Sequence, residues 1–217
     1  ATSVTSVSGT ASAFSTLVSG ITGDTIDLAT NFAATVSDSL TVSQANALDA
    51  VNGTGQITAT ISNTSAPTLA TLTGMHAYTI TVENDVVDVV DENGDPVLDD
   101  NGDPVTQPVA VQASDLNTID SRTSVQVTAT AVTTITGSAS DFASLVTAAT
   151  TIPGVGLGAP NVCTKTISLS GDFAATVTGT SASASDLNTI DGATTTKVDA
   201  TSVTSVSGTA SAFSTLV

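Results

Sequence analysis

Short segments with two large apolar residues three positions apart recur along the chain. Each reads Ala-Ser-x followed by the apolar pair, or a close variant of that form. They lie at residues 11–18, 66–72, 113–120, 139–146 and 184–191, with a looser relative at 43–51. In the segment 184–191, Leu187 and Ile190 fall on one face of a helix. A Ser or Asp just ahead of such a pair is a helix N-cap, so the pattern predicts short amphipathic helices.

Runs rich in Thr and Val follow these segments and predict strands. Residues 125–129 alternate apolar and polar positions, and β-branched residues favour extended backbone. The run 132–136 ends at Gly137, where we expect a corner. The sequence FAATV occurs at 32–36 and again at 173–177, so the predicted strands repeat as well as the predicted helices.

These elements belong to longer sequence repeats. Residues 113–146 align without a gap to 184–217, with 20 identities in 34 positions at an offset of 71. A weaker copy begins near Ser43. Residues 1–18 and 200–217 are identical, which defines a period of 200 − 1 = 199 residues. We therefore expect the chain to be a window on a longer tandem array, with modules that begin near residues 11, 42, 66, 113, 139 and 184.

A module of one short helix and one or two short strands cannot bury its own apolar face, but stacked copies can. The repeats therefore predict a repeat solenoid, β-rich with short helices, and tandem β-sandwich domains are the alternative. The expected segments are the end of a preceding module (1–10), three modules (11–73), an acidic hairpin insertion (74–112), two modules (113–146), a Gly/Pro loop and strand insertion (147–183), and a sixth module that enters the next period (184–217).

The charge balance is strongly acidic. Three cations, Arg122, Lys165 and Lys197, stand against 20 carboxylates, for a net charge of −17. Nucleic acid and anionic membranes are bound through Lys and Arg, so we expect neither as a partner. We also expect no membrane insertion, because no apolar run reaches the roughly 20 residues that span a bilayer. Cys163 is the single cysteine, which predicts either a small buried residue or, alternatively, an interchain bridge.

The stretch 86–111 carries an eight-residue duplication, DENGDPVL followed by DDNGDPVT. Asn-Gly followed by Asp-Pro is strong turn chemistry, because Gly supplies positive φ and Pro fixes φ near −65°. We predict a hairpin flanked by strands at 86–90 and 105–111. Nine of the 20 carboxylates fall between Glu83 and Asp103, so the hairpin is acidic.

Clustered Asp and Asn oxygens in this hairpin suggest a weak Ca²⁺ site. The candidate ligands are Asp91, Asn93, Asp95, Asp99, Asn101 and Asp103. The helix-loop-helix calcium motif fails, because its glycine position holds Pro96 or Pro104 and its final Glu position holds Gly102 or Ala110. The other interpretation is an exposed hairpin whose charge prevents pairing between sheet edges. No cofactor is required on either interpretation.

Catalytic signatures are missing from the sequence. His76 is the only histidine, and it stands before a strand-like run, so we predict a structural role for it. A zinc site needs His/Cys clusters, and a sugar cleft normally adds aromatic platforms, whereas aromatic residues make up 3% of this chain. We therefore expect neither an enzyme nor any catalytic residue.

The modules ASDLNTIDGATT, VDATSVTSVSGTASAF and TVSQANALDAVNGTGQITATIS resemble repeats in giant secreted bacterial cell-surface proteins. Cyanobacterial examples are the most similar, including the large surface protein of non-flagellar swimming. The resemblance implies an extracellular, calcium-rich location and export without a cleaved N-terminal signal.

The expected function is that of a structural repeat unit in an extracellular fibre or cell-surface layer, in contact with other copies of itself. The alternative is an adhesin that binds a glycan or surface through the 74–112 and 147–183 insertions. Ice binding is a third interpretation, suggested by recurring Thr-x-Thr pairs, but unequal module lengths disfavour one flat threonine face.

Overall fold

The computed structural model describes residues 4–150 and 166–216. Across these residues, seven helices and fourteen strands follow one another along the chain. The chain divides into two compact units. The first comprises residues 4–82, 115–128, 148–150 and 166–168 of the described chain, and the second comprises 83–114, 129–147 and 169–216.

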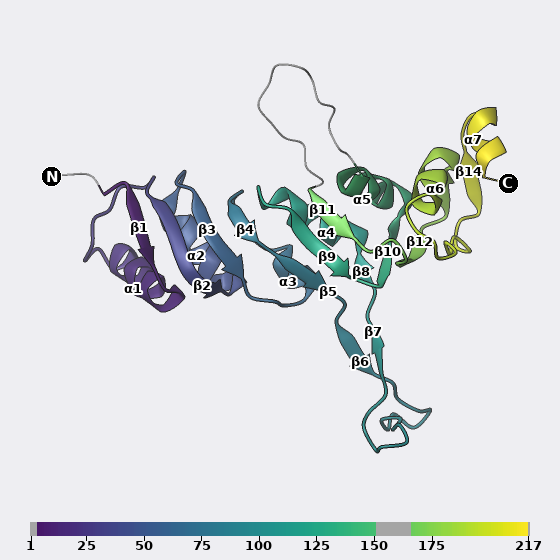
Figure 1. Ribbon diagram of the computed structural model, residues 1–217, viewed down its shortest axis with the longest axis horizontal. Helices are drawn as coiled ribbons and strands as arrows, with labels where there is room; N and C mark the ends of the chain where they lie inside the picture. Colours follow the sequence, from purple (N-terminus) through teal and green to yellow (C-terminus); the bar gives the residue numbers. More distant parts are fainter. Residues whose placement is uncertain (1–3, 151–165, 217) are drawn as a thin grey trace. The chain divides into compact units, whose positions relative to one another are not determined.

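A four-stranded parallel sheet forms the first part of unit 1, in the order β1-β2-β3-β4 (Figure 1). Its strands are β1 (Ser6–Gly9), β2 (Ala33–Leu40), β3 (Ile57–Ile61) and β4 (Ala77–Thr79). Three helices lie between them in the sequence, namely α1 (Ala11–Thr22), α2 (Val42–Asn52) and α3 (Ala66–Leu69). Each strand is therefore joined to its parallel neighbour through a helix, as parallel pairing requires.

Another three-stranded sheet has the order β11-β9-β5. Its strands are β5 (Thr81–Glu83), β9 (Val127–Ala131) and β11 (Ile167–Leu169). Val127 and Ala129 are buried and Thr128 between them is exposed. The alternation predicted for residues 125–129 is thus confirmed for the second half of that run, whereas Val125 is exposed and precedes the strand.

Unit 2 holds a parallel sheet of order β12-β10-β8 and a parallel pair of β13 with β14. The strands are β8 (Val111–Gln112), β10 (Thr134–Ser138), β12 (Ala174–Thr178), β13 (Ser181–Ser183) and β14 (Ser205–Ser207). The remaining helices of the chain are α4 (Ala113–Ser121), α5 (Ala139–Thr150), α6 (Ala184–Asp191) and α7 (Ala210–Thr215).

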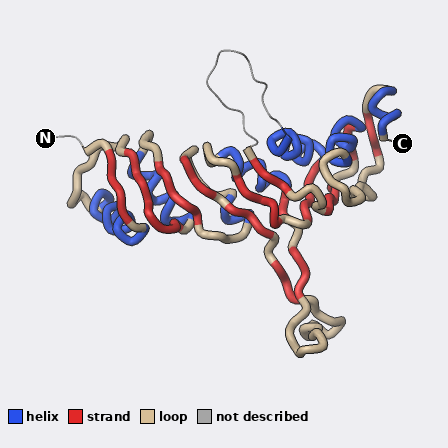
Figure 2. The backbone as a smooth tube through the Cα atoms, in the orientation of Figure 1, coloured by secondary structure: helices blue, strands red, loops and turns tan. Residues whose placement is uncertain are grey.

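The acidic stretch forms the predicted hairpin. β6 (Val86–Asp88) pairs with β7 (Thr106–Pro108) in antiparallel register, and their far ends carry the duplicated loops (Figure 2). We call residues 86–108 the acidic arm. The predicted Gly/Pro loop, with Cys163, falls at 151–165 and lies outside the described residues.

The helices begin at least two positions earlier than the sequence pattern suggests. In α6 the N-cap is Ser183, which precedes the Ala-Ser-Asp triplet and accepts a hydrogen bond from the N–H of Asp186 at 2.9 Å. Thr10 caps α1 in the same way, and Thr41 forms a capping box with Gln44 at the start of α2. The predicted apolar face is confirmed, since Leu187 and Ile190 are both buried.

Gly137 lies inside β10 and not at the predicted corner. A Cβ at this position would come within 2.9 Å of the Ala113 Cβ, so the absent side chain permits a close approach between β10 and the start of α4. A Cβ at Gly208, 71 residues later, would likewise come within 3.0 Å of the Ala184 Cβ, at the start of α6. Both glycines therefore allow the backbone to pack closely against the first residue of a helix.

The prediction of a β-rich repeat solenoid is wrong, and so is the alternative of tandem β-sandwiches. The described residues form an α/β structure of mostly parallel sheets with seven helices. The physical reason lies in the order of the elements. Strands that alternate with helices pair in parallel through helical connections, which defines the α/β class, whereas a sandwich requires antiparallel strands on two facing sheets.

Candidate functional site

The six candidate calcium ligands lie in two equivalent loops of the acidic arm. Asp91 Oδ1 accepts hydrogen bonds from the N–H groups of Asn93 and Asp95, at 2.8 and 3.0 Å. In the next loop Asp99 Oδ1 accepts the same two bonds, from Asn101 at 2.8 Å and from Asp103 at 2.9 Å. The structure thus brings each predicted set of three together as a turn in which one carboxylate oxygen is already bonded to backbone amides.

The backbone of the arm closes on itself through three valines. The N–H of Val89 donates to Val105 O, that of Val97 to Val89 O, and that of Val105 to Val97 O, each at 2.8 Å. These valines are eight residues apart, which is the length of the duplication. Gly94 and Gly102 both have φ near 87°, in the left-handed region that glycine tolerates. The duplication therefore produces a loop cluster whose backbone groups are hydrogen-bonded to one another.

Weak calcium binding by the arm stays a prediction. Among the described residues, no group of three or more His, Cys, Asp or Glu side chains is placed to hold a metal ion. A ligand that binds only the native state must raise stability. Bound Ca²⁺ would therefore raise the thermal midpoint in millimolar CaCl₂, with MgCl₂ as the control for ionic strength. An unchanged midpoint would remove this prediction.

The carboxyls of Asp91 and Asp99 are expected to titrate below the usual value of 3.8. In each, the backbone N–H four residues on, and then the one two residues on, lowers the pKa by a hydrogen bond that favours the charged form. The contribution of these carboxylates to the stability of the arm is therefore complete above pH 3.8, the usual pKa. It is lost as the pH falls through the lowered pKa. Carboxyl NMR titration tests this, with the urea-unfolded chain as reference. Equal midpoints in both states would contradict it.

His76 lies buried in unit 1, just before β4. Its Nε2 lies 2.8 Å from Asp49 Oδ1, and its Nδ1 accepts a hydrogen bond from the N–H of Ile57 at 3.3 Å. Because Nδ1 is an acceptor, the ring proton resides on Nε2, which donates to Asp49. Both ring nitrogens are therefore used inside the unit, where they connect α2 to β3.

Tyr78 completes this buried cluster. Its ring meets that of His76 edge-on, with centroids 5.3 Å apart and planes at 65°. Burial, with a further contribution from the charge of Asp49, raises the pKa of the Tyr78 hydroxyl. That hydroxyl has no hydrogen-bond partner among the described residues. The cluster therefore presents a neutral phenol and a fully bonded imidazole, an arrangement that suits packing.

A pair of threonine hydrogen bonds recurs at the 71-residue offset. Thr123 Oγ1 donates to Tyr78 O at 2.6 Å and accepts from the N–H of Val125 at 3.0 Å. Thr194 Oγ1 donates to Phe173 O at 2.6 Å and accepts from the N–H of Thr196 at 3.1 Å. Each threonine follows a helix and fixes the chain after it to an earlier segment. Sequence reasoning missed these residues, although their identity in the repeat alignment was a signal for them.

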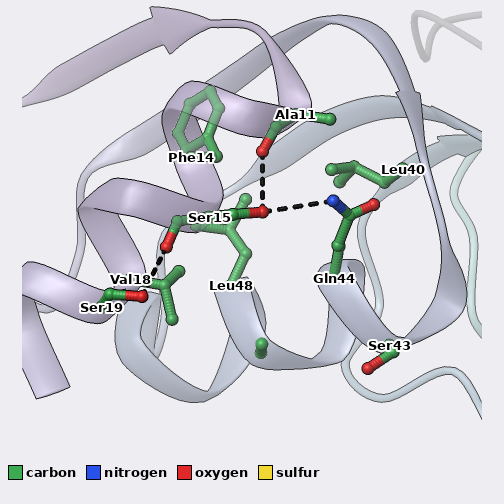
Figure 3. Close-up of a pocket in the computed structure, with 10 residues that line it drawn as sticks. Ala11, Phe14, Ser15, Val18, Ser19, Leu40, Ser43, Gln44 and Leu48 are labelled. Carbon is green, nitrogen blue, oxygen red and sulfur yellow. Dashed lines mark hydrogen bonds between the residues drawn. The ribbon is translucent and has the colours of Figure 1, made fainter.

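A groove of about 210 Å³ lies between α1 and α2 (Figure 3). Apolar side chains such as Phe14, Val18 and Leu48 line it, and Gln44 Nε2 donates to Ser15 Oγ across it at 3.2 Å. The residues lining it carry no charge. It has no groups that would hold a metal or an ionic substrate.

No family model, curated protein or solved structure matches this chain. Within residues 4–150 and 166–216, the helices are too short or too polar for any of them to cross a membrane. The resemblance to giant repetitive surface proteins stays a prediction.

Proposed function

We propose that this chain is a structural repeat unit of a long extracellular fibre or cell-surface layer, with a role in spacing, coating, adhesion or motility. The observation that supports this most is that segments related by sequence form the same local structure. The threonine hydrogen bonds recur at a 71-residue offset, and the identical segments 1–18 and 200–217 each form a strand followed by a helix. A mechanical protein gains length by reusing one unit.

Surface labelling of the organism that encodes the chain tests this proposal. Antibodies against the acidic arm are suitable, because the arm is exposed. Intact cells should be labelled, and negative-stain microscopy of material shed from them should show labelled filaments or sheets. Antibody absorbed with the purified chain is the control. Labelling only after permeabilisation would contradict the proposal.

A second candidate function is adhesion to a glycan or another surface, and the acidic arm favours it. Six of the twelve large apolar side chains that are exposed in the described chain lie on or beside the arm, namely Val86, Val87, Val90, Val97, Leu98 and Val109. Exposed apolar groups gathered in one place often mark binding sites. The contribution of the 147–183 insertion stays a prediction.

The structure suggests a clean deletion for testing adhesion. The N–H of Val109 donates to Asp85 O at 2.6 Å, so the arm closes at its base. A two-residue Asn-Gly turn can therefore replace residues 86–108 with little disturbance. Binding of the intact chain to glycan and mineral arrays should be lost in this deletion variant and kept in the Asp100→Asn variant, which leaves the arm and its exposed apolar side chains in place. Equal binding by the deletion variant would contradict adhesion through the arm.

A further inference from the structure

The acidic arm contains a two-stranded sheet with no packing partner in the described part of the chain. There β6 and β7 pair only with each other, and every residue of both strands is exposed (Figure 2). Successive residues of a strand point to opposite faces, so Val86, at 62% exposed, and Val87, at 46%, place an apolar side chain on each face. A two-stranded hairpin alone is marginally stable in water. A further strand would therefore stabilise this pair.

The outer edge of β6 is the edge suited to a further strand. The N–H of Val89 donates to Val105 O at 2.8 Å, so the backbone groups of odd-numbered residues on this side of the arm face β7. Backbone groups of alternate residues in an antiparallel pair point to opposite edges, so those of Val86 and Asp88 face outward. The outer edge of β7 instead contains Pro108, which has no N–H to donate.

Charge restricts which strand can occupy this edge. Nine carboxylates lie between Glu83 and Asp103, and residues 83–111 contain no Lys or Arg. A second copy of this chain has a net charge of −17 and is repelled, in the way that charged side chains prevent pairing between sheet edges. A segment that carries Lys or Arg is attracted. The carboxylates that exclude an acidic strand therefore favour a cationic one.

The two faces of β6 define the pattern that a matching strand needs. Asp88 lies on the same face as Val86, and Val87 lies on the opposite face, because side chains alternate along a strand. Side chains directly across from each other on neighbouring strands stabilise the pair when they are opposite in charge or both apolar. A strand that alternates cationic and apolar residues can thus place its cations beside Asp88 and its apolar side chains beside Val87.

We propose that the outer edge of β6 binds an extended cationic segment of another protein, which adds to the β6–β7 pair as a third strand. Main-chain hydrogen bonds to Val86 and Asp88 hold the segment, and its alternating Lys or Arg and apolar side chains provide selectivity. The proposal rests on the second candidate function, since it names a class of partner for the same arm.

Fluorescence anisotropy of a labelled heptapeptide, Lys-Val-Lys-Val-Lys-Val-Lys, tests this with the intact 217-residue chain. The peptide should bind saturably, and it should not bind the variant in which an Asn-Gly turn replaces residues 86–108. A Lys-Ser peptide of the same length and charge lacks the apolar side chains and should bind at least about tenfold more weakly. Absence of saturable binding by the Lys-Val peptide, or equal binding by the Lys-Ser peptide, overturns the proposal.

Two substitutions at Val86 test whether the peptide adds as a strand. Val86→Pro removes the outward N–H at the first position of an edge strand, where proline is tolerated, and should weaken binding at least about tenfold. Val86→Ala keeps that N–H and should change binding by less than about threefold. Amide NMR signals of Val89 and Val105 check that the arm stays folded. Equal effects of the two substitutions would contradict strand addition.

A pair of charge reversals separates the arm from the overall charge of the chain. Asp88→Lys should weaken binding of the Lys-Val peptide at least about tenfold, because like charges then face each other across the edge. Asp27→Lys is the matched control: it changes the net charge by the same amount at an exposed position of unit 1, outside the arm. It should bind as the unchanged chain does.

Equal losses in Asp88→Lys and Asp27→Lys would show that the peptide responds only to net charge, and would overturn the proposal. Surface labelling of cells and binding to glycan and mineral arrays do not involve this peptide. Both candidate functions can therefore stand when the cationic partner fails, and a failure of either is recognised by its own experiment.

Discussion

Replacing Phe14 with alanine should lower the free energy of unfolding of unit 1 by about 3 kcal/mol. The Phe14 side chain of α1 is 3% exposed and lines the groove between α1 and α2. Removal of its ring forfeits the hydrophobic transfer energy and enlarges the groove beside it. The lower end of the range for Phe→Ala is expected, because that groove is open and water can fill part of the new space.

The same substitution at Phe213 is the matched control, since the local sequences are identical from 200 to 217 and from 1 to 18. Phe213 is 39% exposed, so its loss should cost less than about 1 kcal/mol at concentrations where the chain is monomeric. Tyr78 is the only tyrosine and the chain has no tryptophan, so tyrosine fluorescence in urea reports the unfolding of unit 1 directly. A Phe14→Ala variant with an unchanged midpoint would contradict the packing described for α1.

The local elements of this chain could be predicted from its sequence because their signals are local. Leu187 and Ile190 are buried as their spacing indicates, and the Asn-Gly-Asp-Pro repeats form the expected hairpin between β6 and β7. Both features depend on residues within a few positions of each other.

The sheets could not be predicted in the same way. Which strands pair depends on contacts between residues far apart in the chain, such as Thr134 with Ala174. Repeats in the sequence indicate that elements recur. Recurring elements that are too small to bury their own apolar faces predict a solenoid. The alternation of strand and helix was the better guide, because it predicts parallel pairing through helical connections.

The candidate sites show a similar division. Asp91 and Asp99 were singled out because carboxylates gather there, but a cluster of oxygen atoms predicts a metal ligand and a turn equally well. The structure shows which backbone N–H groups these oxygens accept from. The roles of Asp49 and Tyr78 beside His76 could not be predicted at all, because they depend on tertiary contacts between segments distant in the sequence.

Replacing Thr123 with valine should destabilise unit 1 by about 2 kcal/mol. Valine has nearly the same shape, so packing is kept and only the hydroxyl is lost. The carbonyl of Tyr78 and the N–H of Val125 then lose the partner that Thr123 Oγ1 provides, at 2.6 and 3.0 Å. Thr123 is 8% exposed, so water cannot easily replace the hydroxyl.

Two variants serve as matched controls for Thr123→Val. One is a conservative change at Thr123 itself, and the other is the same change at Thr194, its counterpart in the repeat. Thr123→Ser keeps the hydroxyl and should recover most of the lost stability, because both hydrogen bonds can re-form. Thr194→Val removes the equivalent pair of bonds in unit 2, but Thr194 is only half-buried, so its effect should be smaller, about 1 kcal/mol. Tyr78 fluorescence follows the first substitution, and hydrogen exchange at the amides of Thr196 and β12 follows the second. If Thr123→Val and Thr123→Ser were equally destabilising, the loss would come from packing, and the recurring threonine would not be what fixes the chain after each helix to an earlier segment.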